Sequence, residues 1–111
     1  MQIKVNEIIV EEIRNKIKEI MEKNDKVALK EELKKLAENF NVDINFDILY
    51  YDAPLGYNVY DLNVFINITD KIKSKVDVIV LTFFVSEVKE NFKIERSIKL
   101  KDINVFSYKL Q

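Results

Sequence analysis

Apolar residues recur at every third or fourth position over the first forty residues of the chain. This spacing gathers them on one face of an α-helix, while Glu, Lys and Arg fill the opposite face. The pattern predicts two amphipathic helices, over about residues 7–23 and 26–40. Asn6 suits the N-cap of the first helix and Asp25 that of the second, because both side chains can accept hydrogen bonds from free backbone N–H groups. The apolar stripes are Ile9, Ile13, Ile17 and Ile20 or Met21 in the first helix, and Leu29, Leu33, Leu36, Ala37 and Phe40 in the second.

From residue 42 onward the apolar period changes to two, which is typical of β-strands. The strands expected from this alternation run over about residues 42–51, 57–69, 76–88, 92–101 and 103–110. Arg96 falls on the apolar side of the fourth, and we expect it at the sheet edge or reaching into solvent. Alternation is poorest in the fifth. We therefore predict an α+β fold, a single domain over residues 1–111 with two N-terminal helices packed on an antiparallel meander sheet of four or five strands.

The first two strands flank the segment Asp52–Gly56, which contains the only Pro and the only Gly of the chain. Pro presets one backbone dihedral and Gly accepts a positive φ, so the segment predicts a hairpin loop. The apolar residues of both strands are even-numbered, and a loop of five residues pairs them with one another on a shared inner face. In this register Ile48 lies opposite Tyr60 on the inner face, and Asp47 lies opposite Asp61 on the outer face.

The outer face of the sheet is also rich in apolar residues. Leu49, Val59 and Phe65 belong to it, and the strand over 76–88 is apolar on both sides. Such a face is covered either by curvature of the sheet around the helices or by another protein. Of the two we favour an interface, either with a second copy of the chain in a homodimer or with a protein partner.

The chain contains neither Cys nor His. The absence of Cys excludes disulfides, thiolate metal sites and cysteine nucleophiles, and the absence of His removes the commonest general base and transition-metal ligand. No phosphate-binding loop, dinucleotide-binding or nucleophile motif is present. We therefore expect no catalytic residue, no cofactor and no metal ion, and hence no enzyme. With one Gly, the tight turns must be built mainly from Asn, Asp, Ser and Lys.

Nothing in the sequence suggests export or a membrane anchor. The first residues have no uninterrupted apolar core, and no stretch approaches eighteen apolar residues without a charge. The expected location is the cytoplasm.

The candidate binding residues cluster around the hairpin. Residues 41–70 carry five Asp and no Lys or Arg, although the net charge of the whole chain is −1. Such a surface is either merely solvated or steers a basic partner. Tyr51 and Tyr57 are expected to pair across the loop mouth, with Leu55 at the apex, and exposed Tyr beside an apolar tip is typical of interface anchors, unless it only stabilises the tip. The candidate partner-binding residues are Tyr51, Leu55, Tyr57, Asp47 and Asp61.

Two other functions are weaker alternatives. The predicted opposition of Asp47 and Asp61 indicates a carboxylate site that binds a hard cation or hydrolyses a substrate, although flat sheet faces rarely supply enough ligands. Lys71, Lys73 and Lys75 form a basic loop, but the acidic balance of the chain and its scarce Arg disfavour nucleic-acid contact. The sequence therefore predicts a small non-catalytic protein-interaction module, of inhibitor or adaptor type, that uses the acidic, Tyr-rich hairpin and the outer sheet face.

Overall fold

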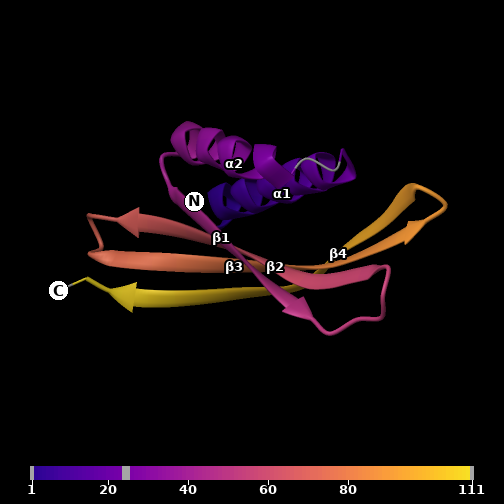
Figure 1. The fold of residues 1–111 in the computed structure, drawn as a ribbon. Helices are drawn as coiled ribbons and strands as arrows, with labels where there is room; N and C mark the ends of the chain where they lie inside the picture. Colours follow the sequence, from indigo (N-terminus) through magenta and orange to yellow (C-terminus); the bar gives the residue numbers. More distant parts are fainter. Residues whose placement is uncertain (1, 24–25, 111) are drawn as a thin grey trace. The chain divides into compact units, whose positions relative to one another are not determined.

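The computed structural model of the protein describes residues 2–23 and 26–110. Two helices are followed by four strands, which are α1 (Gln2–Glu22), α2 (Lys26–Phe40), β1 (Asp43–Tyr51), β2 (Tyr57–Asp70), β3 (Lys75–Glu90) and β4 (Lys93–Lys109) (Figure 1). The predicted α+β class, with N-terminal helices and an antiparallel meander sheet, is confirmed. The chain divides into a helical unit, Met1–Val42, and a sheet unit, Asp43–Gln111.

In the helical unit, α1 begins earlier than the apolar spacing predicts. It starts at Gln2, so Asn6 lies inside the helix and the predicted N-cap is wrong. The residues before Asn6 include no Gly or Pro that would stop a helix from extending. Asp25, the cap expected for α2, lies outside the described residues. The buried apolar residues of the two helices are Ile9, Ile13, Ile17, Ile20, Met21, Leu29, Leu33 and Leu36.

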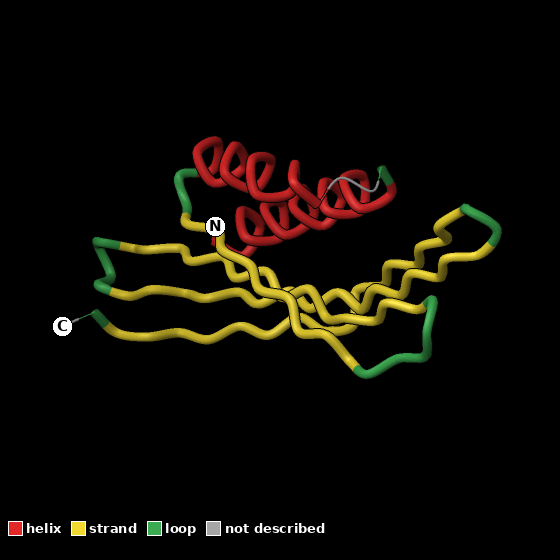
Figure 2. Tube along the Cα trace, viewed as in Figure 1, coloured by secondary structure: helices red, strands yellow, loops and turns green. Residues whose placement is uncertain are grey.

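The sheet unit is a simple meander with the strand order β1-β2-β3-β4, and all neighbouring strands are antiparallel. Figure 2 shows the loop over 52–56 and the turn over 91–92 at one end of the sheet, and the turn over 71–74 at the other. The two edge strands differ in length: β1 has 9 residues and β4 has 17. The two edges of the sheet are therefore unequal.

The register of the first hairpin differs from the predicted one by two residues. Ile48 lies opposite Leu62 rather than Tyr60, and Asp47 lies opposite Asn63 rather than Asp61. The pair of β1 and β2 nearest the loop is Tyr51 with Val59. The first two residues of β2 extend beyond β1 and pair with β3 alone. A shift of two residues keeps every side chain on its predicted face, since side chains alternate with a period of two.

The two C-terminal strands predicted from the sequence form one long strand, β4, with a β-bulge in its middle. Phe83 lies opposite Leu100, whereas the preceding Thr82 lies opposite Asp102, so Lys101 is an extra residue. An extra residue exchanges the faces of all residues that follow it. This explains why the alternation beyond Lys101 is hard to follow in the sequence.

The inner face of the sheet comprises the even-numbered residues of β1 and β2, the odd-numbered residues of β3, and their partners in β4. Its buried apolar residues are Tyr60, Leu62, Val64, Ile66, Ile79, Leu81, Phe83 and Val85. Arg96 also lies on this face. Its strand is an edge strand, as one of the two expectations had it. Its side chain, however, is 7% exposed and its Nη2 lies 2.8 Å from Glu87 Oε2, so the alternative that it reaches into solvent is wrong. A buried guanidinium is tolerated here because a carboxylate on the neighbouring strand pairs with it.

The turns use residues other than Gly, as the composition requires. Asn41, Ser74 and Asn91 have positive φ, as does Gly56. Phe92 is the unusual case, because its φ is 64° and its side chain is fully exposed. A bulky residue in the left-handed region is strained, and Gly is the usual choice at this turn position.

Candidate functional site

The candidate site lies on the outer face of the sheet, which comprises the odd-numbered residues of β1 and β2, the even-numbered residues of β3, and their partners in β4. Tyr51 is the last residue of β1, Asp61 lies in β2 and Phe84 lies beside it in β3. Lys101 comes from β4, where it is the extra residue of the bulge and follows Lys99 on the outer face. We call these four residues the Tyr51 cluster.

Asp61 is the polar centre of the Tyr51 cluster. Its Oδ2 accepts a hydrogen bond from the Tyr51 hydroxyl and lies 3.3 Å from Lys101 Nζ. Lys101 Nζ also lies 3.3 Å from the Tyr51 hydroxyl, and it stands over the Tyr51 ring at 5.8 Å from the centroid. These contacts raise the pKa of Lys101 above its usual value, first through the hydrogen bond with Tyr51 and next through that with Asp61. The ammonium group of Lys101 is therefore held in its charged form.

Burial is unequal within this network. The side chain of Asp61 is 9% exposed, whereas that of Lys101 is 50% exposed. Asp61 Oδ1 is buried and has no hydrogen-bond partner. A buried carboxylate is costly unless it is paired, so Asp61 depends on Tyr51 and Lys101 for its stabilisation.

The cluster also presents an aromatic surface. The rings of Tyr51 and Phe84 are tilted by 51°, with their centroids 6.2 Å apart. Both side chains are partly exposed, as is the neighbouring Leu49. Tilted aromatic pairs of this kind fix each other's orientation while leaving one side of each ring accessible. The outer face thus offers a fixed apolar surface with a positive charge beside it.

Asp47 belongs to a different network, which crosses three strands. Asn63 Nδ2 donates to Asp47 Oδ1 at 3.0 Å, and Thr82 Oγ1 donates to Asn63 Oδ1 at 2.8 Å. The predicted direct opposition of Asp47 and Asp61 is wrong, because Asp61 lies opposite Leu49. Residues 2–23 and 26–110 contain no group of three or more acidic side chains placed to hold a metal ion.

The loop after β1 holds the remaining predicted residues. Leu55 is fully exposed and Tyr57 is partly exposed, and the backbone N–H of Tyr57 donates to Pro54 O at 3.0 Å. Tyr57 pairs with Val88 of β3, so the predicted pairing of Tyr51 with Tyr57 across the loop mouth is wrong. The structure brings Tyr51 and Asp61 together. It places Tyr57 at the start of β2, beyond the end of β1, where β2 pairs with β3 alone.

Three residues of this region were not among the predicted partner-binding residues. Lys101 and Phe84 complete the Tyr51 cluster, and Phe92 is exposed at the tip of the β3–β4 hairpin. The break in alternation at Lys101 was a visible signal, because a residue that interrupts the period of two often marks a bulge. Phe92 had a weaker signal, since Asn-Phe stands where Asn-Gly is usual.

The basic loop carries its own counter-charges. Asp70 Oδ1 accepts hydrogen bonds from the backbone N–H groups of Ile72 and Lys73, at 3.1 and 3.0 Å. Lys75 Nζ lies 3.7 Å from Asp77 Oδ2. Asp70 thus shapes the turn, and Lys75 is engaged with a carboxylate.

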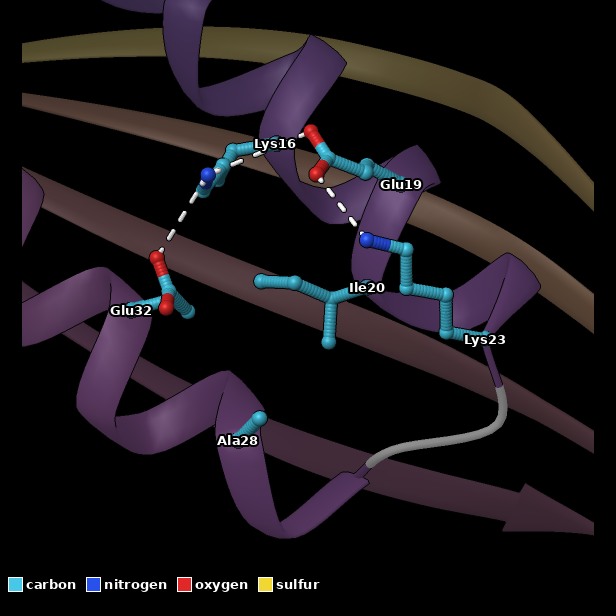
Figure 3. Close-up of a pocket in the computed structure, with 6 residues that line it drawn as sticks. All are labelled: Lys16, Glu19, Ile20, Lys23, Ala28 and Glu32. Carbon is cyan, nitrogen blue, oxygen red and sulfur yellow. Dashed lines mark hydrogen bonds and ion pairs between the residues drawn. The ribbon is translucent and has the colours of Figure 1, made fainter.

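A pocket of about 200 Å³ lies between α1 and α2 in the helical unit (Figure 3). It is lined by Lys16, Glu19, Ile20, Lys23, Ala28 and Glu32. Lys16 Nζ lies 3.5 Å from Glu32 and 3.9 Å from Glu19, and Lys23 Nζ lies 3.4 Å from Glu19. These charged side chains pair with one another around the pocket, so they do not point to a ligand.

The chain matches no protein-family model, and no curated protein or solved structure shows significant similarity to it. Within the described residues, no helix has the length and apolar character needed to cross a membrane.

Proposed function

We propose that the protein is a small non-catalytic protein-interaction module, of inhibitor or adaptor type, which binds a protein partner through the Tyr51 cluster on its outer sheet face. The observation that supports this most strongly is the state of Tyr51. Its side chain is 41% exposed, while its hydroxyl is held by the buried Asp61 and by Lys101. The ring is thus both accessible and fixed in place.

A fixed aromatic ring is suited to protein binding for two reasons. Tyr supplies a large contact area with few rotatable bonds, and it is enriched among the residues that dominate binding energy. A side chain that is already ordered loses less entropy when a partner binds, so more of its contact energy remains as affinity. Phe84 and Leu49 extend the same apolar surface around the ring.

The charges around the Tyr51 cluster indicate which charges a complementary partner would carry. The β1 side of the outer face carries Asp43 and Asp47, and Asp52 follows in the loop. Lys99 and Lys101 stand on the β4 side, where the same face also carries two acidic residues. A complementary partner would present an apolar centre, with basic groups toward β1 and acidic groups toward Lys99 and Lys101. Such charges set the orientation and rate of association more than its affinity.

The test is retention of protein from an extract of the native host on the immobilised chain, comparing matched variants. Tyr51→Ala combined with Tyr57→Ala should abolish retention of a species that the unaltered chain captures. The variant loses the hydrogen bond from Tyr51 to the buried Asp61 and some stability with it, so its far-UV circular dichroism spectrum must first be shown to match that of the unaltered chain.

The matched control is Ile72→Ala combined with Phe92→Ala, which removes two large apolar side chains that are fully exposed at the other hairpin turns. This control should retain the captured species at the level of the unaltered chain. If the tyrosine double variant captures the species equally well, or if both double variants lose it equally, the Tyr51 cluster is not the binding surface.

A further inference from the structure

The free edge of β4 is the second unusual surface of the sheet unit. β4 is the last strand in the sheet order, so one side of its backbone has no neighbouring strand within the described residues. Residues 103–108 of this strand read Ile-Asn-Val-Phe-Ser-Tyr and contain no charge, Pro or Gly. All six are exposed, including Ile103, Val105, Phe106 and Tyr108. An exposed, uncharged edge of this composition is a template for pairing with another strand.

The other edge segments carry the features that normally prevent such pairing. β1 has Asp43 and Asp47 among its nine residues. The first half of β4 contains Lys93 and Lys99, and it ends at the bulge of Lys101. Charged side chains and bulges both discourage the addition of a strand. The 103–108 segment is the longest stretch of the two edges that lacks these features, and residues 48–51 of β1 form a shorter one.

We propose that this edge pairs with a second copy of the chain, β4 against β4, in antiparallel orientation about a two-fold axis, so that the four-stranded sheet continues into that of its partner. The inference does not depend on the Tyr51 cluster, because it uses the backbone edge of β4 rather than the outer face of the sheet.

The segment is complementary to itself. In a pairing centred on Val105, Asn104 lies opposite Phe106 of the second copy, and Ile103 lies opposite Ser107 of the second copy. Asp102 then lies opposite Tyr108 of the second copy, whose hydroxyl can donate to a carboxylate. Each pair combines residues of the same sheet face, as antiparallel pairing requires. Over residues 102–108 no two like charges face each other, which is the electrostatic condition for a stable pair. The proposed pairing is limited to this stretch, because one step further Lys101 would face Lys109 of the second copy.

A head-to-tail contact, β4 against β1 of the next copy, is the competing arrangement. It would combine the basic half of β4 with the acidic β1, but β1 has 9 residues and β4 has 17. The uncharged half of β4 would remain unpaired, and the contact would repeat from copy to copy, closing only where its rotation forms a ring. A two-fold pairing covers the uncharged segment and closes after two copies.

The test is the mass of the protein in solution, measured by light scattering and sedimentation over a range of concentrations. The unaltered chain should sediment as a dimer of the 13.2 kDa polypeptide. Val105→Lys and Val105→Glu should each weaken the dimer at least about tenfold, because each places two like charges directly opposite across the axis. An equal mixture of the two variants should restore a dimer, since opposite charges then face each other. This restoration also shows that both variants are folded.

Ile94→Lys is the matched control, because Ile94 is an exposed apolar residue in the first half of β4. This variant should remain dimeric. A monomeric unaltered chain at every concentration, or a mixture of the two Val105 variants that stays monomeric, would overturn the proposal. A ladder of larger species that disappears with Asp47→Lys would show head-to-tail assembly instead.

Discussion

The two faces of the sheet each contain one buried carboxylate, and the two are stabilised differently. On the inner face, the side chains of Glu87 and Arg96 are 8% and 7% exposed, and both charges are buried together. On the outer face, Asp61 is as buried as Glu87, but the side chain of Lys101 is half exposed. The hydroxyl of Tyr51 supplies the second contact to Asp61.

This difference indicates that the Glu87–Arg96 pair is structural, whereas the Asp61 network holds exposed groups in position for a partner. A fully buried pair has no access to a partner, so its only consequence is for folding and for the register of the strands that carry it. The Asp61 network instead fixes an accessible ring and an accessible ammonium group. On the outer face, the buried Asp61 therefore orients Tyr51 and Lys101, which remain exposed to solvent.

The largest expected effect comes from breaking the inner pair. Arg96→Met should reduce the free energy of unfolding by about 3–5 kcal/mol, because it leaves the Glu87 carboxylate buried without its counter-charge. Lys101→Met is the matched change on the outer face and should cost distinctly less, since solvent already reaches half of that side chain. Urea unfolding of both variants measures the comparison, and equal losses would show that the two ion pairs have the same role.

A smaller loss is expected from Tyr51→Phe, which removes only the hydroxyl that donates to Asp61. The free energy of unfolding should fall by about 2 kcal/mol, the cost of removing a hydrogen bond to a buried charged group. Tyr57→Phe alters an exposed tyrosine and serves as the control, for which no change beyond about 0.5 kcal/mol is expected. If the two substitutions cost the same, Asp61 does not depend on Tyr51.

The smallest effect is confined to alkaline pH and concerns Tyr60 on the inner face. Burial raises the pKa of Tyr60 above its usual value, and the negative charge of Glu87 adds to the rise. Above about pH 10 the unfolded chain loses this proton while the folded chain keeps it, so stability falls as pH rises, by up to about 1.4 kcal/mol per pH unit. Tyr60→Phe should make this decline shallower. Urea unfolding between pH 9 and pH 11 provides the measurement, and an unchanged slope would contradict the assignment.

Much of the fold follows from alternation alone. The period of two assigned the residues of β1 and β2 to their faces, because a one-residue error would expose the whole apolar set. The same period does not distinguish registers that differ by two residues, because every side chain then stays on the same face. The pairs of the first hairpin were therefore predicted on the correct faces but in the wrong register, and Asp47 was wrongly placed opposite Asp61.

The site itself was less predictable, since its contacts join distant strands. Tyr51 and Lys101 are separated by 50 residues, and their contact depends on the register of three strand pairs. No local pattern encodes such a contact. Tyr51 was identified as a candidate because exposed Tyr beside an apolar tip is typical of interface anchors, and Asp61 because the hairpin is acidic. Their mutual hydrogen bond could be identified only from the observed register.

The most direct test of the outer-face proposal is a two-dimensional NMR titration of the isotopically labelled chain with the species that it captures. Resonances of Leu49, Tyr51, Phe84 and Lys101 should shift or broaden first, while those of the inner-face residues Leu62 and Phe83 should stay unchanged. The account would be contradicted if the perturbed resonances belonged to the inner face or to the turn over 71–74 and those of the Tyr51 cluster did not move.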